Sequence, residues 1–139
     1  AGEVARYIAA WTESDLRRAE RDLARFFDIS LDLFCLAGLD GHFRRINPNF
    51  SRVLGHSGEE LLRRPFLDFV HPDDHPATRA AMEQLSHGLP VARFRNRYRD
   101  ARGGYRTFEW TAKCVPEEGL IFAVARDVTR PEGGAPVRP

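Results

Sequence analysis

The order of turn-forming residues in the first half of this chain constrains its fold more than any other feature. Two strand-like runs, residues 33–39 and 42–46, flank the pair Asp40-Gly41. Asp and Gly tolerate the positive φ angles of a tight turn, so the pattern predicts a β-hairpin. Asn47-Pro48 follows at once, and Asn47 can cap a helix whose first residue is Pro48. The chain is therefore expected to form a hairpin and to turn directly into short helices.

Local signals place three short helices after the hairpin. Gly55 ends the first helix, and Ser57 with Glu60 forms a capping box that opens the second. The next helix is expected to be capped by Asp73. Its inner face is expected to carry Thr78, Ala81, Met82 and Leu85.

The last third of the chain has the pattern of a three-stranded meander. Residues 91–99 and 105–115 alternate between polar and apolar positions, as strands with one buried face do. The inner face of the first strand is expected to carry Ala92, Phe94, Asn96 and Tyr98, and that of the second Phe108, Trp110, Ala112 and Cys114. Residues 120–126 are apolar on both faces, which predicts a central strand. Residues 131–139 have the Pro and Gly density of a linker.

The first 27 residues differ from the rest and predict an amphipathic helix. An apolar stripe steps by three, four and three positions along Leu16, Ala19, Leu23 and Phe26. Thr12 and Asp15 can form a variant of the capping box at its start. Two interpretations stay open. The stripe either packs on its own domain or pairs with a second chain as part of a coiled coil.

Composition and charge favour a single cytoplasmic domain. The 139 residues, of which 42% are hydrophobic, suffice for one buried core. No apolar run approaches the roughly 20 residues of a membrane-spanning helix, and no signal-peptide pattern opens the chain. We therefore expect no direct membrane contact. The net charge of +1 provides no bulk field that would attract nucleic acid.

Several of these fragments, in this order and spacing, resemble a PAS domain. They are Asn47-Pro48, Gly55, Glu59-Glu60-Leu61-Leu62, His71-Pro72-Asp73-Asp74 and Asp127-Val128-Thr129. The resemblance covers residues 28–130 and leaves 1–27 as an N-terminal helical segment. It implies an α+β fold, in which short helices over one face of a five-stranded antiparallel sheet, of order 2-1-5-4-3, enclose a cavity.

The resemblance also implies a function. PAS domains are mostly non-catalytic sensory modules that regulate an effector domain in the same polypeptide, and we expect the parent of this one to be a multidomain signalling protein, a bacterial sensor histidine kinase. The flanking helices of the family commonly pair, so a homodimer is expected. Asp127 and Thr129 match the family's signalling motif, and we expect them to hold the end of the last strand to the start of the domain. The helix-breaking Arg130-Pro131 pair departs from the family, which continues there into a charged helix.

A small organic ligand in the cavity is one expectation, and its contacts follow from the strand alternation. They are Asn96, Tyr98, Phe108, Trp110, Ala112, Ile121 and Ala123, with Met82 from the helix. Of these, Asn96 and Tyr98 are the expected hydrogen-bonding groups. In the alternative interpretation large side chains fill the cavity, and the domain is a ligand-free spacer for protein interaction.

Flavin and haem are both disfavoured as cofactors. Relatives that form a flavin photoadduct carry a reactive cysteine in a helix, and the corresponding residues 62–67 contain none. Haem-binding relatives use a helix histidine, whereas His75 and His87 fall at the two ends of the last helix.

Two other functions are weighed and disfavoured. The cluster His71-Pro72-Asp73-Asp74-His75 could ligate a metal and activate water in a hydrolase, but helix capping explains its carboxylates. Four arginines alternate along residues 93–99 and suggest nucleic-acid binding. The aromatic residues of that strand point to the opposite face, so no stacking platform accompanies the charge.

Overall fold

The computed structural model describes residues 12–130, so the expected linker at 131–139 lies outside the described residues. Helix α2 (Glu13–Ile29) comes first and is followed by strands β1 (Leu33–Gly38) and β2 (Phe43–Ile46). Three helices then cross over: α3 (Asn49–Leu54), α4 (Gly58–Arg63) and α5 (His75–Ser86). Strands β3 (Val91–Arg99), β4 (Tyr105–Val115) and β5 (Leu120–Asp127) complete the domain. The short 3₁₀ turns are η1 (Phe66–Asp68), η2 (Pro72–Asp74) and η3 (Pro116–Glu118).

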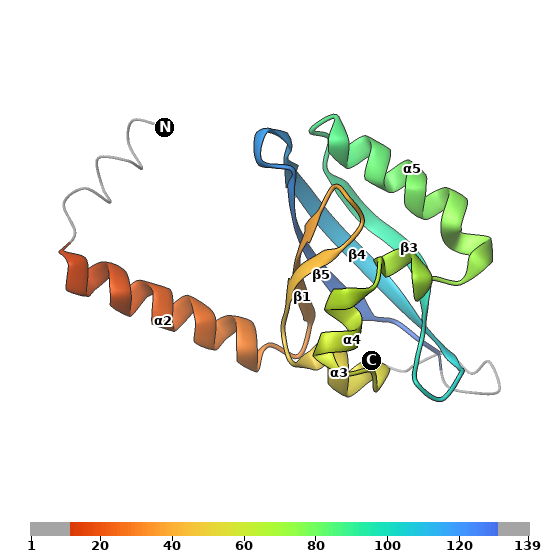
Figure 1. The fold of residues 1–139 in the computed structure, drawn as a ribbon, viewed down its shortest axis with the longest axis horizontal. Helices are drawn as coiled ribbons and strands as arrows, with labels where there is room; N and C mark the ends of the chain where they lie inside the picture. The colour runs from red at the N-terminus through yellow and green to blue at the C-terminus, as the bar shows by residue number, and fades with distance from the viewer. Residues whose placement is uncertain (1–11, 131–139) are drawn as a thin grey trace.

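The five strands form one antiparallel sheet in the order β2-β1-β5-β4-β3, which confirms the expected fold. The last strand of the chain is central, between β1 and β4. The Asp40-Gly41 turn joins the outer hairpin, and Gly41 has the positive φ of 88° that favours glycine. Figure 1 shows the short helices gathered on one side of the sheet, with α5 alongside β3 and β4.

The core lies between the inner face of the sheet and these helices. Its largest fully buried side chains include Phe50 and Leu54 of α3, Leu61 of α4 and Phe108 of β4. Each helix is too short to be stable alone, so it depends on the apolar residues that it packs on the sheet.

Asn47 does not cap α3, contrary to the sequence expectation. Its fully buried side chain donates to the Asp32 carbonyl over 2.9 Å and accepts from the Phe34 backbone N–H over 3.2 Å. The Asn49 amide likewise donates to the Leu31 carbonyl. The two asparagines thus hold the connection between α2 and β1.

Strand β3 also departs from the strict alternation expected for it. Its register with β4 shifts between Val91 and Phe94, and Arg93 there has a φ of 57°. Val91 is consequently buried and Ala92 exposed, the reverse of the expectation. An extra residue in one strand moves the following side chains to the other face, so the bulge accounts for the reversal.

Helix α2 begins with the predicted capping box of Thr12 and Asp15. It continues to Ile29, so the domain boundary expected after residue 27 falls inside it. The helix has no buried residue and extends away from the sheet (Figure 1). In the apolar stripe, Leu23 is 69% exposed and Phe26 67%, so the domain's own surface does not cover these side chains. Neither α2 nor any other helix in residues 12–130 has the length and apolar content to cross a membrane.

We predict that Asn47→Ala lowers the free energy of unfolding by about 2–4 kcal/mol, since the Asp32 carbonyl and the Phe34 N–H both lose their partner in a buried place. Urea unfolding of the wild type and the variant measures the difference. Arg52→Ala on the exposed side of α3 is the control and should change stability by less than about 0.5 kcal/mol. Equal stabilities for the Asn47 variant and this control would show that the two hydrogen bonds of Asn47, called the Asn47 clamp below, contribute nothing to the stability of the fold.

Candidate functional site

A cavity of about 60 Å³ lies between the inner face of the sheet and α5. The structure places seven of the eight expected contact residues in its wall: Met82, Asn96, Tyr98, Trp110, Ala112, Ile121 and Ala123. The eighth, Phe108, does not line it. Its ring is fully buried beside the rings of Tyr98 and Trp110, with centroids 5.2 and 6.2 Å away.

The rest of the wall comes from residues that the sequence interpretation did not select. They are Cys35, Ala37, Phe43, Phe66, Thr78, Ala81, Leu85, Val91 and Phe94. Four of them, Thr78, Ala81, Leu85 and Phe94, were correctly placed on the inner face of a helix or strand without being selected as contacts. Alternation shows which way a side chain faces but not how closely two elements approach, so it could not separate wall residues from filled core.

A chain of hydrogen bonds uses the polar groups that point inward. The Trp110 indole donates to Asn96 Oδ1 over 2.8 Å, and the Asn96 amide donates to Thr78 Oγ1 over 3.3 Å. Thr78 in turn donates to the Asp74 carbonyl over 2.7 Å. The surface that faces the cavity is left apolar.

The titratable groups of the wall are neutral near pH 7. Burial raises the pKa of the Cys35 thiol. Burial, and to a lesser degree the nearby Cys35, raises the pKa of the Tyr98 hydroxyl well above its usual value. Neither group therefore presents a charge to a cavity occupant.

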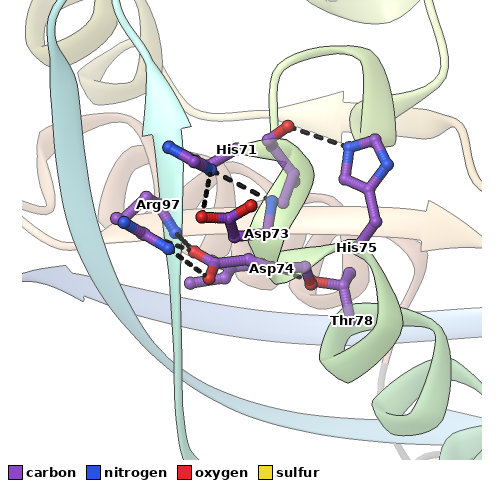
Figure 2. A network of polar contacts seen from close by, with 8 residues as sticks. His71, Asp73, Asp74, His75, Thr78 and Arg97 are labelled. Atoms are coloured by element: carbon purple, nitrogen blue, oxygen red, sulfur yellow. Dashed lines mark hydrogen bonds and ion pairs between the residues drawn. The ribbon is translucent and has the colours of Figure 1, made fainter.

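Residues 71–75 form a polar corner where α5 begins, shown in Figure 2. The Asp74 carboxylate accepts the Arg97 side chain through Nε at 2.9 Å and Nη2 at 2.8 Å, and also the Arg97 backbone N–H at 2.8 Å. These bonds lower the pKa of Asp74. The expected capping by Asp73 is wrong, because its own N–H donates to His71 Nδ1 over 3.1 Å while its carboxylate stays exposed.

This corner does not assemble a metal site. Within residues 12–130 no three His, Cys, Asp or Glu side chains converge as ligands would. Asp74 is held by the Arg97 guanidinium, whose positive charge opposes a cation there. The His75 ring bonds the Val70 carbonyl at 2.9 Å. The geometry gives the hydrolase interpretation no support.

The arginines of β3 are likewise divided among separate partners. Arg95 pairs with Glu109 of β4 at 2.9 Å, and Arg97 is committed to Asp74. Arg93 lies in the bulge. Two of the four arginines are therefore paired with carboxylates.

At the exit of β5, Asp127 and Thr129 lock the strand end onto β4. Arg106 Nε donates to Asp127 Oδ2 over 2.9 Å, and the Thr129 N–H donates to Asp127 Oδ1 over 3.0 Å. Thr129 Oγ1 accepts from the Thr107 N–H at 2.8 Å. The partner is therefore the start of β4, and the expectation of a bond to the start of the domain is wrong.

Comparisons with known proteins agree with this architecture. A family model described as PAS fold matches residues 43–124. A domain of the sensory box sensor histidine kinase/response regulator from Geobacter sulfurreducens is 21% identical, with a TM-score of 0.71, over 84% of this chain and 100% of that one. The PAS domain of an HTR-like protein from Haloarcula marismortui is 22% identical, with a TM-score of 0.70, over 83% of this chain and 96% of that one. A PAS domain from Colwellia psychrerythraea is 17% identical, with a TM-score of 0.67, over 78% and 96%. No curated protein matches the sequence.

The Asp74–Arg97 pair predicts a pH-dependent stability. The pKa of Asp74 lies below its unfolded value of about 3.9, so the contribution is present above that pH and is lost as pH falls through the folded pKa. At pH 7, Asp74→Asn should lower the free energy of unfolding by about 1–2 kcal/mol, a range reduced for the partly exposed Arg97.

Urea unfolding from neutral pH down to about pH 2 measures this effect, and the gap between wild type and Asp74→Asn should close below about pH 4. Asp73→Asn is the matched control and should differ little from wild type at any pH, since the Asp73 carboxylate is 78% exposed. A gap of constant size across the range would assign the effect of Asp74 to something other than its charge.

Proposed function

The chain belongs to the PAS fold family, and we propose that it acts as a non-catalytic sensory and regulatory module of a longer, cytoplasmic signalling protein. One observation carries the proposal. Strands β4 and β5 line the cavity with Ala112, Ile121 and Ala123, and the same strand pair ends in the lock of Arg106 and Asp127.

A sensor needs a structural connection between its ligand cavity and its output, and strands β4 and β5 provide one. An occupant that pushes on the inner face of β4 or β5 acts on two strands whose relative position is fixed by the lock at their far end. A small shift between the strands would change the direction in which the chain leaves Thr129. We propose this exit as the output joint toward an effector domain in the same polypeptide.

A sensor histidine kinase is the parent protein that we propose. A similar solved structure supports this setting, because it is a domain of a sensor histidine kinase/response regulator. The domain fold supports a module that regulates a kinase rather than one that performs catalysis itself.

We propose no flavin or haem for the cavity. Sites for small molecules and cofactors usually measure about 300–1,000 Å³, whereas this cavity measures about 60 Å³. Large side chains such as Trp110 and Phe43 occupy the remaining space. The same observation supports the rival function, a ligand-free spacer for protein interaction, in which the lock transmits movements of neighbouring domains without a ligand.

We further propose that α2 mediates a homodimer. Leu23 and Phe26 stay exposed on a helix that extends away from the sheet, so no surface within residues 12–130 covers this end of the apolar stripe. The same helix of a second chain offers a stripe of matching chemistry.

The output joint is tested with the double variant Asp127→Ala/Thr129→Ala in the parent protein. We expect the domain to stay folded, because the lock lies at the end of the sheet, and the effector's output to lose its regulation. Glu118→Ala/Thr111→Ala is the matched control, since it removes an exposed carboxylate and an exposed hydroxyl elsewhere and should leave regulation intact. Regulation that persists in the Asp127/Thr129 variant at the wild-type level would exclude this exit as the joint.

The dimer is tested with Leu16→Glu/Leu23→Glu. Like charges in the stripe should give a folded monomer by light scattering at micromolar concentration, with the strand signal in circular dichroism unchanged. Arg18→Glu, a charge reversal outside the stripe, should leave the dimer intact. A dimer that survives both leucine substitutions would place the interface elsewhere, and loss of the sheet would show that the helix belongs to its own core.

A further inference from the structure

A second hollow, open to the surface, lies directly outside the buried cavity. It measures about 280 Å³ and lies between the β1–β2 turn, with Leu39, Asp40 and Gly41, and the outer side of α5, with Arg79, Glu83 and Ser86. Two side chains, Phe66 and Met82, line both this hollow and the cavity. They therefore form the partition between the inside of the domain and solvent.

The two side chains of the partition differ in freedom. Phe66 is 6% exposed, its ring packs 5.5 Å from that of Phe43, and its N–H donates to the Gly41 carbonyl over 2.8 Å. Met82 is only partly buried, is unbranched and has three rotatable side-chain bonds. A rotamer change of Met82 requires no backbone movement, whereas displacing the Phe66 ring requires the loss of its packing against Phe43.

We propose that Met82 is a gate through which a compact apolar molecule passes from the surface hollow into the cavity. This inference rests on the proposed sensory function and adds the route and the chemical class of the ligand. The class follows from the wall, since Trp110, Asn96 and Thr78 satisfy one another and the surface facing the cavity is apolar. A molecule with hydrogen-bonding groups would lose its bonds to water on entry without replacement.

The size of the cavity narrows this class further. An engineered apolar cavity of about 150 Å³ in another protein stays dry and binds benzene or xenon. The present cavity is smaller, about 60 Å³, and fits an occupant closer to xenon than to an aromatic ring. Loss of bulk at Met82 would enlarge it and open it at the same time.

The thiol of Cys35 is a built-in reporter for entry. It lines the cavity and is 4% exposed. Cys35 also borders a hollow on the opposite face of the sheet, so entry past Met82 is read from the difference between variants and not from the absolute rate. The experiment follows the reaction of methylmercury chloride, a small uncharged thiol reagent, with the folded chain by mass spectrometry. The Cys35 sulfur forms a bond to mercury as the mercury–chloride bond breaks, and the thiol proton and chloride leave as HCl. Cys114→Ala serves as the background, so that Cys35 is the only thiol.

Two substitutions at Met82 change the rate in opposite directions. Met82→Ala should speed the reaction at least about tenfold, because it removes the partition. Met82→Ile keeps similar bulk but is stiff at χ1, and should slow the reaction several-fold. Leu85→Ala is the matched control. Leu85 lies on the same helix and lines the cavity but not the outer hollow, so its rate should change only as far as its urea-measured loss of stability explains.

The outcomes separate the gate from other routes. Equal acceleration by Met82→Ala and Leu85→Ala, after correction for stability, would show that access follows general opening and would overturn the gate. An unchanged or faster rate in Met82→Ile would overturn it as well, and this variant preserves the packing on which folding depends.

Xenon tests the ligand class and keeps this inference distinct from the proposed function. In methyl NMR under xenon pressure, the Ala112, Ile121 and Met82 methyl signals should shift with saturation, and exposed Ala101 should serve as the control that does not. Absence of saturable shifts would refute the apolar ligand. If xenon and the Met82 variants behave as expected but occupancy leaves the parent protein's output unchanged, the proposed sensory function fails while the gate stands.

Discussion

Strand β5 pairs along its length with β1 on one side and β4 on the other, and the rest of the domain depends on this double pairing. Its inner face carries the small residues Ala123 and Ala125, which leave space above the middle of the sheet. Aromatic rings from the surrounding elements fill most of that space: Phe43, Phe50, Phe66 and Trp110. Since close packing of rigid rings rarely fills a volume completely, the cavity lies where the rings meet the flexible Met82.

The hydrogen-bond chain from Trp110 to Asp74 gives that cavity its chemistry and also fixes one of its walls. Helix α5 is held to β3 near its N-terminal end, by Thr78 on Asn96 and by Asp74 on Arg97. No comparable polar contact in the described residues ties its middle to the sheet, where Met82 lies. The helix is thus held by polar contacts near its N-terminal end and, through Gln84 on the Pro90 carbonyl, near its C-terminal end. Apolar contacts pack the stretch between them, where the Met82 side chain can change rotamer without moving the helix backbone.

Periodicity and turn chemistry were enough to predict all five strands, the helix order and seven of the sixteen residues of the cavity wall. Two of the errors have one physical cause, since each concerns a side chain whose partner is distant in the sequence. Asn47 bonds the start of β1 instead of the adjacent helix, and Asp127 bonds Arg106, 21 residues away. Local capping rules consider only neighbours within a turn. The sequence pattern did not predict the bulge at Arg93 for a related reason, because a bulge is defined by the register of β3 against β4.

Entry to the domain and exit from it lie at the same end of the sheet, because Leu33, the first residue of β1, pairs with Ala125 near the end of β5. The Asn47 clamp on the α2–β1 connection and the Asp127 lock therefore lie near each other. The proposed gate is at the opposite end of β1, beside the turn at Gly41. Strands β1 and β5 run between the two ends as a paired unit and both line the cavity, so an occupant that pushes on either strand would act on both connections through the same hydrogen-bonded ladder. A change in occupancy would then reposition α2 and the exit together, which allows one small cavity to act on both flanking segments at once.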